Sequence, residues 1–225
     1  MSSGRITPAS LSSERGFRER SASRLHARPA NTLFDPNSGR AHGRSDWDLN
    51  PELSADLAVM ETPSPAAVLV PIVLRAELTV LLTQRTAHLA KHAGQIAFPG
   101  GREDPEDASP VETALREAEE EIGLQRSYVE VIGFLDGYRT GTGFAITPVV
   151  GLVKPGFSLA LHEGEVADAF EIPLAFLMNV DNHQQHRREW HGRERAFWAI
   201  PYGERYIWGA TAGMLRNLHE RLFTE

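Results

Sequence analysis

The stretch FPGGREDPEDASPVETALREAEEEIGL, residues 98–124, decides how the rest of the chain is interpreted. It opens on two adjacent glycines, Gly100 and Gly101, which leave room for a ligand to approach the backbone. It closes on a cluster of like charge within five positions, made of Glu117, Glu119, Glu120 and Glu121. A folded protein needs a reason to keep such a cluster.

The second half of this stretch predicts a helix over residues 110–122. Ser109 is a good N-cap, and Pro110 suits the first helical position. Glu112, three residues after Ser109, completes a capping-box pattern, and Gly123 is typical of a helix end.

On that helix the acids divide between two directions. At about 100° per residue, Glu117, Glu120 and Glu121 share one face, whereas Glu119 points elsewhere. A narrow apolar stripe beside the acidic face can pack on a sheet, and it consists of Val111, Leu115, Ala118 and Ile122.

The three carboxylates on one face have two interpretations. Like charges three or four positions apart cost a few tenths of a kcal/mol per pair, and the only cation inside the helix is Arg116. The face is either a solvated acidic surface or a site for Mg²⁺ or Mn²⁺, which prefer oxygen ligands and bridge carboxylates to phosphates.

The stretch also resembles the Nudix box, a glycine followed by an acid and then R-E-U-x-E-E-x-G-U, where U is apolar. The second half matches at Arg116, Glu117, Ala118, Glu120, Glu121, Gly123 and Leu124. The first half departs from this pattern in two ways. The interval from Gly101 to Arg116 is one residue longer than the usual spacing, and Asp107 replaces the expected glutamate. The resemblance implies the Nudix fold, an α/β/α sandwich with a mixed central β-sheet, within the α/β (α+β) class.

Residues 81–101, LLTQRTAHLAKHAGQIAFPGG, are similar to a second signature, that of the coenzyme A pyrophosphatase branch. Thr86 and Ala90 depart from it, and Ala90 stands where the branch has an arginine. Lys91 is adjacent, with a different reach and no bidentate fork. Likeness to this branch covers roughly residues 64–220, and it implies substrate contacts from Arg85, Lys91, Gly100 and Gly101.

The resemblance implies a metal-dependent hydrolase that cleaves the diphosphate of coenzyme A or its derivatives. The products would be 3′,5′-ADP and 4′-phosphopantetheine or its acyl form. Mg²⁺ or Mn²⁺ would bind Glu117, Glu120 and Glu121, and the substrate would be a small nucleotide-type molecule. Expected catalytic residues are Glu120, Glu121, Arg116 as the group that orients a glutamate, and Glu165 as a loop base, with Glu163 as its neighbouring candidate.

Two other functions stay open at this point. One is a Nudix enzyme for ADP-ribose, a dinucleotide or a nucleoside triphosphate. The other is a Nudix domain that binds without hydrolysis, against which the intact Glu117, Glu120 and Glu121 set argues.

Several further side chains carry both a functional and a structural interpretation. His88 and His92 are loop histidines that suit metal binding or acid–base work, although most loop histidines do neither. Phe144 and Tyr138 could stack on adenine, and core packing is the commoner use of such rings. The run HQQHRREWHGRER, residues 183–195, is most simply a solvated hairpin, with a partner or homodimer surface as the second interpretation.

The composition limits the classes of protein to which this chain could belong. The 225 residues carry a net charge of -7, with eight arginines against three acids in residues 1–45. The remaining acidic part disfavours nucleic acid as a partner. No apolar run is long enough to cross a membrane, and no cysteine is present. We expect a cytoplasmic protein, with a mitochondrial transit peptide as the alternative reading of the Arg/Ser-rich start.

Turn-forming residues and apolar runs predict the domain bounds and the order of the strands and helices. Residues 1–60 are expected to be a largely flexible extension and residues 61–225 the hydrolase domain, with one or two helical turns in 47–60. Apolar, β-branched runs predict strands over 66–74, 78–85, 95–98, 129–135, 145–153 and 166–172, followed by a hairpin turning at His191-Gly192. A last helix is predicted over 208–223.

Overall fold

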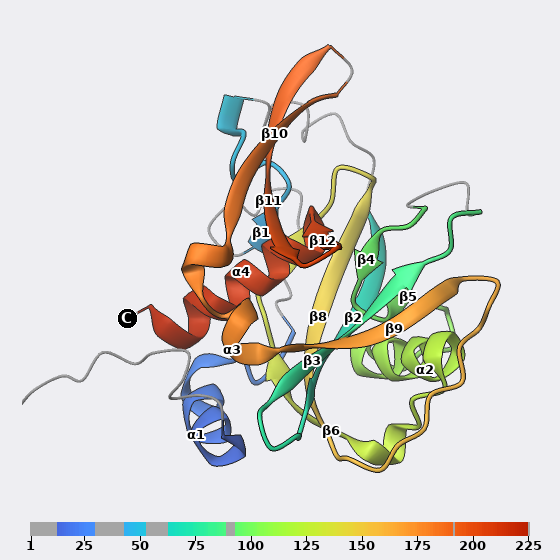
Figure 1. Ribbon diagram of the computed structural model, residues 1–225. Coiled ribbons are helices and arrows are strands. Elements are labelled where there is room, and N and C mark those ends of the chain that lie inside the picture. Colours follow the sequence, from blue (N-terminus) through green and yellow to red (C-terminus); the bar gives the residue numbers. More distant parts are fainter. Residues whose placement is uncertain (1–12, 30–42, 53–62, 89–92, 191, 225) are drawn as a thin grey trace, which may run out of the picture.

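A mixed sheet lies at the centre of the computed structural model, with helices on both of its sides (Figure 1). The structure describes residues 13–29, 43–52, 63–88, 93–190 and 192–224. Over these residues the large sheet has nine strands, and a second, antiparallel sheet has three. The α/β/α sandwich predicted from the sequence is confirmed.

The strands of the large sheet are β1 (Gly43–Ser45), β2 (Ser64–Val73), β3 (Thr79–Arg85), β4 (Ile96–Ala97), β5 (Gly100–Arg102), β6 (Val129–Phe134), β7 (Gly137–Arg139), β8 (Phe144–Val153) and β9 (Val166–Pro173). The small sheet contains β10 (Gln184–Trp190), β11 (Arg193–Tyr202) and β12 (Arg205–Trp208). The helices are α1 (Glu14–Arg24), α2 (Pro110–Ile122), α3 (Leu174–Leu177) and α4 (Ala210–Phe223), with single 3₁₀ turns at Arg126–Tyr128 and Val180–Asn182.

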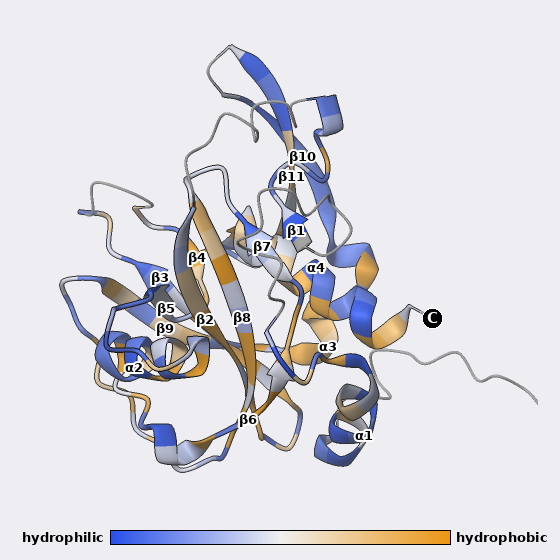
Figure 2. Cartoon of the chain, turned by 180° about the vertical axis from the view of Figure 1, so that it is seen from behind, coloured by the Kyte–Doolittle hydropathy of each residue, from blue (hydrophilic) through white to orange (hydrophobic). Residues whose placement is uncertain are grey.

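The parallel pair β2 and β8 forms the centre of the large sheet, in register from Ser64↔Phe144 to Val73↔Val153. Both strands read as nearly continuous apolar runs because both of their faces are covered. One face packs on α2, and the other packs beneath α1, α4 and the small sheet. The view from behind shows this hydrophobic centre as the orange colouring of β2, β4 and β8 (Figure 2).

Most predicted elements are confirmed within one or two residues. The predicted hairpin is β10–β11, in register from Gln184↔Ala199 to Trp190↔Arg193. The last helix begins at Ala210 and not at 208, because β12 runs to Trp208 and Gly209 then takes a left-handed φ of 66°. Residues 53–60 of the predicted helical turns lie outside the described part. No helix among the described residues has the length and apolarity needed to cross a bilayer.

The N-terminal extension needs a correction, because residues 13–29 and 43–52 are folded against the domain. Phe17 of α1 is fully buried in the main hydrophobic cluster. Arg18 donates to both carboxylate oxygens of Glu130 at 2.7 and 2.8 Å. These residues have little apolar periodicity, and one aromatic ring and several arginines attach them to the domain.

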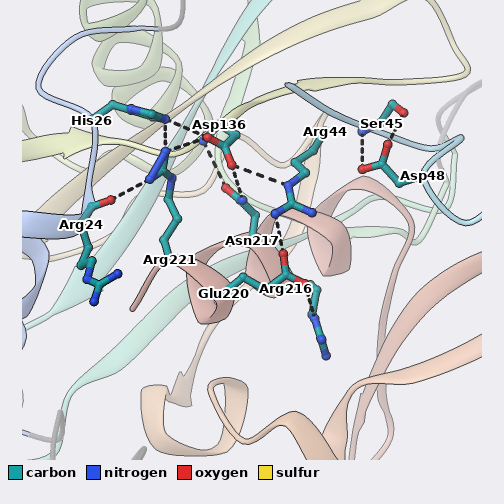
Figure 3. A network of polar contacts seen from close by, with 10 residues as sticks. All are labelled: Arg24, His26, Arg44, Ser45, Asp48, Asp136, Arg216, Asn217, Glu220 and Arg221. Atoms are coloured by element: carbon teal, nitrogen blue, oxygen red, sulfur yellow. Dashed lines mark hydrogen bonds and ion pairs between the residues drawn. The ribbon is translucent and has the colours of Figure 1, made fainter. Parts of the chain in front are cut away.

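A network around Asp136 ties both N-terminal segments to the last helix (Figure 3). Its carboxylate accepts hydrogen bonds from Asn217 and Arg221 of α4, at 2.6 and 2.8 Å. His26, which follows α1, lies 2.8 Å from the same carboxylate. Arg44 of β1 lies 3.6 Å from it and 2.6 Å from Glu220 of α4. Residues 13–29 and 43–52 therefore contribute to the folded domain.

Candidate active site

The acidic helix α2 has the ends that the sequence predicted. The Ser109 side chain accepts a hydrogen bond from the Glu112 backbone N–H, and Gly123 ends the helix at φ 69°. Ala114, Ala118 and Ile122 are fully or almost fully buried against β2 and β8. Packing therefore fixes the rotation of α2, and with it the direction in which the acidic face points.

Arg116 and Asp107 form a clamp at one edge of that face. Arg116 donates from Nε and from its second terminal nitrogen to the two Asp107 oxygens, at 3.0 and 2.8 Å. Asp107 also accepts from Thr113 at 2.9 Å. The Arg116 guanidinium holds the pKa of Asp107 well below its usual range. The unexpected aspartate of the first half-motif is thus an anchor for Arg116.

With its remaining terminal nitrogen, Arg116 contacts the two outer glutamates. It donates to Glu117 at 2.9 Å and to Glu120 at 3.0 Å. Glu120 is largely exposed, with 60% of its side chain accessible, whereas Glu117 has only 18%. Burial raises the pKa of Glu117 above its ordinary value, against the effect of Arg116. One guanidinium therefore sets the positions of two carboxylates that keep oxygens available to a ligand.

The glycine pair lies directly on these glutamates. A side chain at Gly101 would place its Cβ against the Glu117 carboxylate, so a larger residue there would displace this glutamate. The Gly100 backbone N–H donates to Glu121 at 3.2 Å, and Gly100 has φ 154°. The sequence FPGG thus brings strand backbone into contact with the acidic face.

Glu121 is the buried member of the set, with 6% of its side chain exposed. Desolvation raises its pKa to about 7, although the Gly100 N–H and the charge of Arg85 act in the opposite direction. Arg85, the last residue of β3, lies 3.5 Å from the Glu121 carboxylate. Its Nε is buried without a hydrogen-bond partner among the described residues. This leaves a cationic donor beside the acids with capacity for an anion.

The loop before β9 brings a fourth carboxylate close. The negative charge of Glu165 is among the causes that raise the pKa of Glu117 and of Glu121, after desolvation. Its backbone carbonyl accepts from the Thr86 N–H at 2.9 Å, next to Arg85. Its side chain is about half exposed, and 3.7 Å separates it from His162. No contact of Glu163 distinguishes it from an ordinary loop acid.

The donor set fits a divalent cation that prefers oxygen. Glu117, Glu120 and Glu121 offer carboxylate oxygens around a backbone that glycines hold close. Among the described residues, no three or more His, Asp or Glu side chains are already placed so that they could hold a metal ion together. Arg116 occupies one oxygen each of Glu117 and Glu120, so ligation would use their other oxygens or shift this clamp.

Other predicted residues fall elsewhere. Lys91, Ala90 and His92 lie outside the described residues, and His88 is in an exposed turn after β3. Tyr138 does not present a ring to substrate, because it is 5% exposed and its hydroxyl donates to Asp46 at 2.9 Å. Phe144 is half-buried and has the Arg102 guanidinium 5.8 Å from its ring centre.

Comparisons with known proteins show the family of the chain. The NUDIX domain family model matches residues 63–204, and the chain belongs to the Nudix family of hydrolases.

Its relatives include the uncharacterized Nudix hydrolase NudL of Yersinia enterocolitica. The two are 46% identical over 160 residues, which cover 70% of this chain and 80% of the relative. NudL of Escherichia coli K12 is also 46% identical, over 153 residues that cover 68% and 80%. Among solved structures, the NUDIX domain of Shewanella oneidensis NrtR in complex with ADP ribose is 25% identical. It covers 56% of this chain and 84% of that one, with a TM-score of 0.40.

Proposed function

We propose that this Nudix hydrolase cleaves the diphosphate of coenzyme A or its derivatives. The products are 3′,5′-ADP and 4′-phosphopantetheine, or acyl-phosphopantetheine from an acylated substrate. The observation that carries the proposal is the position of Arg85 and Gly100, which both belong to the stretch similar to the coenzyme A branch. Both contact Glu121, Arg85 at 3.5 Å and the Gly100 N–H at 3.2 Å.

The residues divide into a diphosphate-binding side and a water-activating side. Glu117, Glu120 and Glu121 would hold Mg²⁺ or Mn²⁺, a cation that would supply charge neutralisation to the diphosphate and acidify a bound water. Arg85 donates to a phosphate oxygen through the exposed part of its guanidinium, since 27% of its side chain is accessible. Arg116 keeps Glu117 and Glu120 aimed at the diphosphate while Asp107 holds Arg116 itself.

Glu165 is the proposed base that takes the proton from the attacking water. It is exposed enough to meet solvent, and its charge acts on Glu117 and Glu121. Its loop adjoins the end of α2, where the His162 N–H donates to the Glu121 carbonyl at 2.9 Å. A base must lie within hydrogen-bond reach of its proton donor, directly or through one water.

A substrate panel tests the proposal. Coenzyme A, dephospho-coenzyme A, ADP-ribose, NADH and a nucleoside triphosphate are offered at equal concentration with Mg²⁺ or Mn²⁺, and products are identified by mass. We expect coenzyme A to be preferred over dephospho-coenzyme A by about tenfold or more, because one direct hydrogen bond to a charged 3′-phosphate contributes about 1.5–3 kcal/mol. Faster cleavage of ADP-ribose or a triphosphate would assign the enzyme to that substrate instead.

A further inference from the structure

Arg205 stands on the opposite face of the large sheet from Glu121 and contacts the strand that carries Arg85. It is the first residue of β12 and lies one position beyond the stretch matched by the family model. One terminal nitrogen donates to Gln84 of β3 at 2.8 Å, and the other donates to Asp168 of β9 at 2.6 Å. Its guanidinium carbon lies 3.8 Å from the Phe170 ring centre.

These contacts surround an irregularity in the β3–β9 pairing. The register is regular from Thr79↔Pro173 to Gln84↔Asp168 and then shifts to Arg85↔Val166. Ala167 of β9 is left outside the register, so β9 is the strand that bulges, opposite the step from Gln84 to Arg85 of β3. A bulge bends its strand and disrupts the pairing with its neighbour locally. Arg205 holds the last regular pair, Gln84 and Asp168, from one side.

The side chain that emerges beyond this irregularity is Arg85. Consecutive residues of a strand point to opposite faces, so Gln84 meets Arg205 while Arg85 meets Glu121. Arg85 has little hold of its own, because its contact with Glu121 is long at 3.5 Å and its Nε has no partner among the described residues. Its direction therefore depends on where the backbone at the bulge is held.

We propose that Arg205 is a positioning residue, which fixes the β3–β9 bulge through Gln84 and Asp168 and so aims Arg85 at the phosphate site. Arg205 does not touch the substrate. The proposal rests on Arg85 meeting a phosphate group, and it does not depend on coenzyme A being the substrate.

The test compares Arg205→Lys with a matched arginine at the other end of the same strands. Arg75 also makes a bidentate ion pair with a β9 carboxylate, to Glu171 at 2.6 and 3.1 Å, and lies over an aromatic ring, that of Phe157. Steady-state kinetics use whichever panel substrate is cleaved fastest, so failure of the coenzyme A assignment leaves this test intact. Melting temperatures are measured for every variant.

We expect Arg205→Lys to lower kcat/KM by about tenfold, mainly through a higher KM, because lysine keeps the charge but loses the planar fork. Gln84→Ala should act in the same direction with a smaller effect, while Arg75→Lys keeps the wild-type kinetics. In an Arg85→Ala background, Arg205→Lys should change kcat/KM by less than about twofold, since coupled residues are non-additive.

Additive losses in the double variant would overturn the proposal and leave Arg205 as a structural ion pair. An equal kinetic loss in Arg75→Lys would overturn it as well, because general loosening of β9 would then explain the effect. If Arg205→Lys proves too unstable to assay, Gln84→Ala tested with and without Arg85→Ala decides the question in the same way.

Discussion

Two carboxylates on opposite sides of the same sheet show how differently a fold can treat an acid. Burial alone would raise the pKa of Asp136, but the hydrogen bonds from His26 and Asn217 and the charge of Arg221 hold it below its ordinary value. Glu121 has one backbone donor and a distant arginine, and its pKa rises to about 7. The first arrangement satisfies its acid within the protein, and the second leaves capacity for a ligand.

The charge around each site follows the same contrast. Near Asp136, the cations Arg44 and Arg221 come from two elements and connect β1 to α4 (Figure 3). Near Glu121, Arg116 donates to Asp107, Glu117 and Glu120, and no cation among the described residues donates a hydrogen bond to Glu121. We infer that the contacts of Asp136 stabilise the fold. The carboxylates around Glu121 instead keep their mutual repulsion, because binding and catalysis require them.

The largest expected effect concerns the stabilising side. Phe17→Ala should lower the free energy of unfolding by about 3–5 kcal/mol, because it empties a fully buried site. For a chain of this size that lowers the melting temperature by roughly 10 °C. Turnover at 20 °C should be preserved, since α1 packs on α4 and β6 and not on α2.

Arg15→Ala is the matched control on the same helix. Its side chain is 88% exposed and pairs only at the surface with Glu19, so the melting temperature should change little. Wild-type thermal stability in Phe17→Ala would show that α1 does not contribute to the domain, and residues 1–45 would then be dispensable as the sequence suggested.

The second prediction concerns the acidic face. Glu120→Gln should reduce turnover by on the order of 10²-fold, because a carboxylate that would position the divalent metal is lost. The metal-free melting temperature should stay level or rise, since the side chain is mostly exposed and like-charge repulsion is relieved. Metal-dependent activity and calorimetry under chelator measure the two quantities.

Glu119→Gln makes the comparison specific. Glu119 belongs to the same helix and the same charge cluster, but it points away from the site, and its carboxylate lies 3.9 Å from Arg126. We expect Glu119→Gln to keep nearly wild-type activity. Comparable losses in both variants would mean that overall helix charge, and not the assigned face, carries the effect.

The sequence predicted the Glu121 side far better than the Asp136 side, and the reason is physical. Capping and helical spacing are local signals, so they predict α2 and its acidic face without tertiary information. The contact of Gly100 with Glu121 was not predicted, because it forms between a strand and a helix. The Asp107–Arg116 clamp spans nine residues and depends on how a loop folds back. Neither residue type nor spacing indicates that partner.

Long-range contacts account for what was missed. Phe17 joins the core without any periodic pattern around it, and Arg205 meets Gln84 across 121 positions of sequence. The sequence makes Tyr138 a candidate for stacking on adenine. Its hydroxyl instead donates to Asp46, which belongs to the segment expected to be a flexible extension. A single sequence contains no spacing rule for such pairs, because they form only after separate elements have packed.

The third prediction tests the satisfied carboxylate. Asp136→Asn should lower the free energy of unfolding at pH 7 by about 1–3 kcal/mol, because it weakens hydrogen bonds to a charged acceptor and leaves Arg221 and Arg44 underpaired. The folded-state pKa of Asp136 is depressed, so its contribution is complete above the unfolded value of about 3.9 and is lost as pH falls through the folded pKa. The difference between wild type and variant should therefore shrink in acid. A constant difference down to pH 2 would point to packing and not to charge.

The last prediction reverses the sign at Glu121. Its folded pKa of about 7 lies above the unfolded value near 4.5, so the metal-free protein loses stability as pH rises from about 4.5 to 7. Glu121→Gln removes that loss while its amide oxygen still accepts from the Gly100 N–H. With a chelator at pH 8, the free energy of unfolding of the variant should be about 1–2 kcal/mol higher than that of wild type. At pH 4 the two free energies should converge. Denaturant titrations at both pH values measure this, and activity should be severely reduced in the same variant. A Glu121→Gln protein that is less stable than wild type at pH 8 would show that Glu121 is satisfied internally as Asp136 is, and the contrast between the two carboxylates would fail.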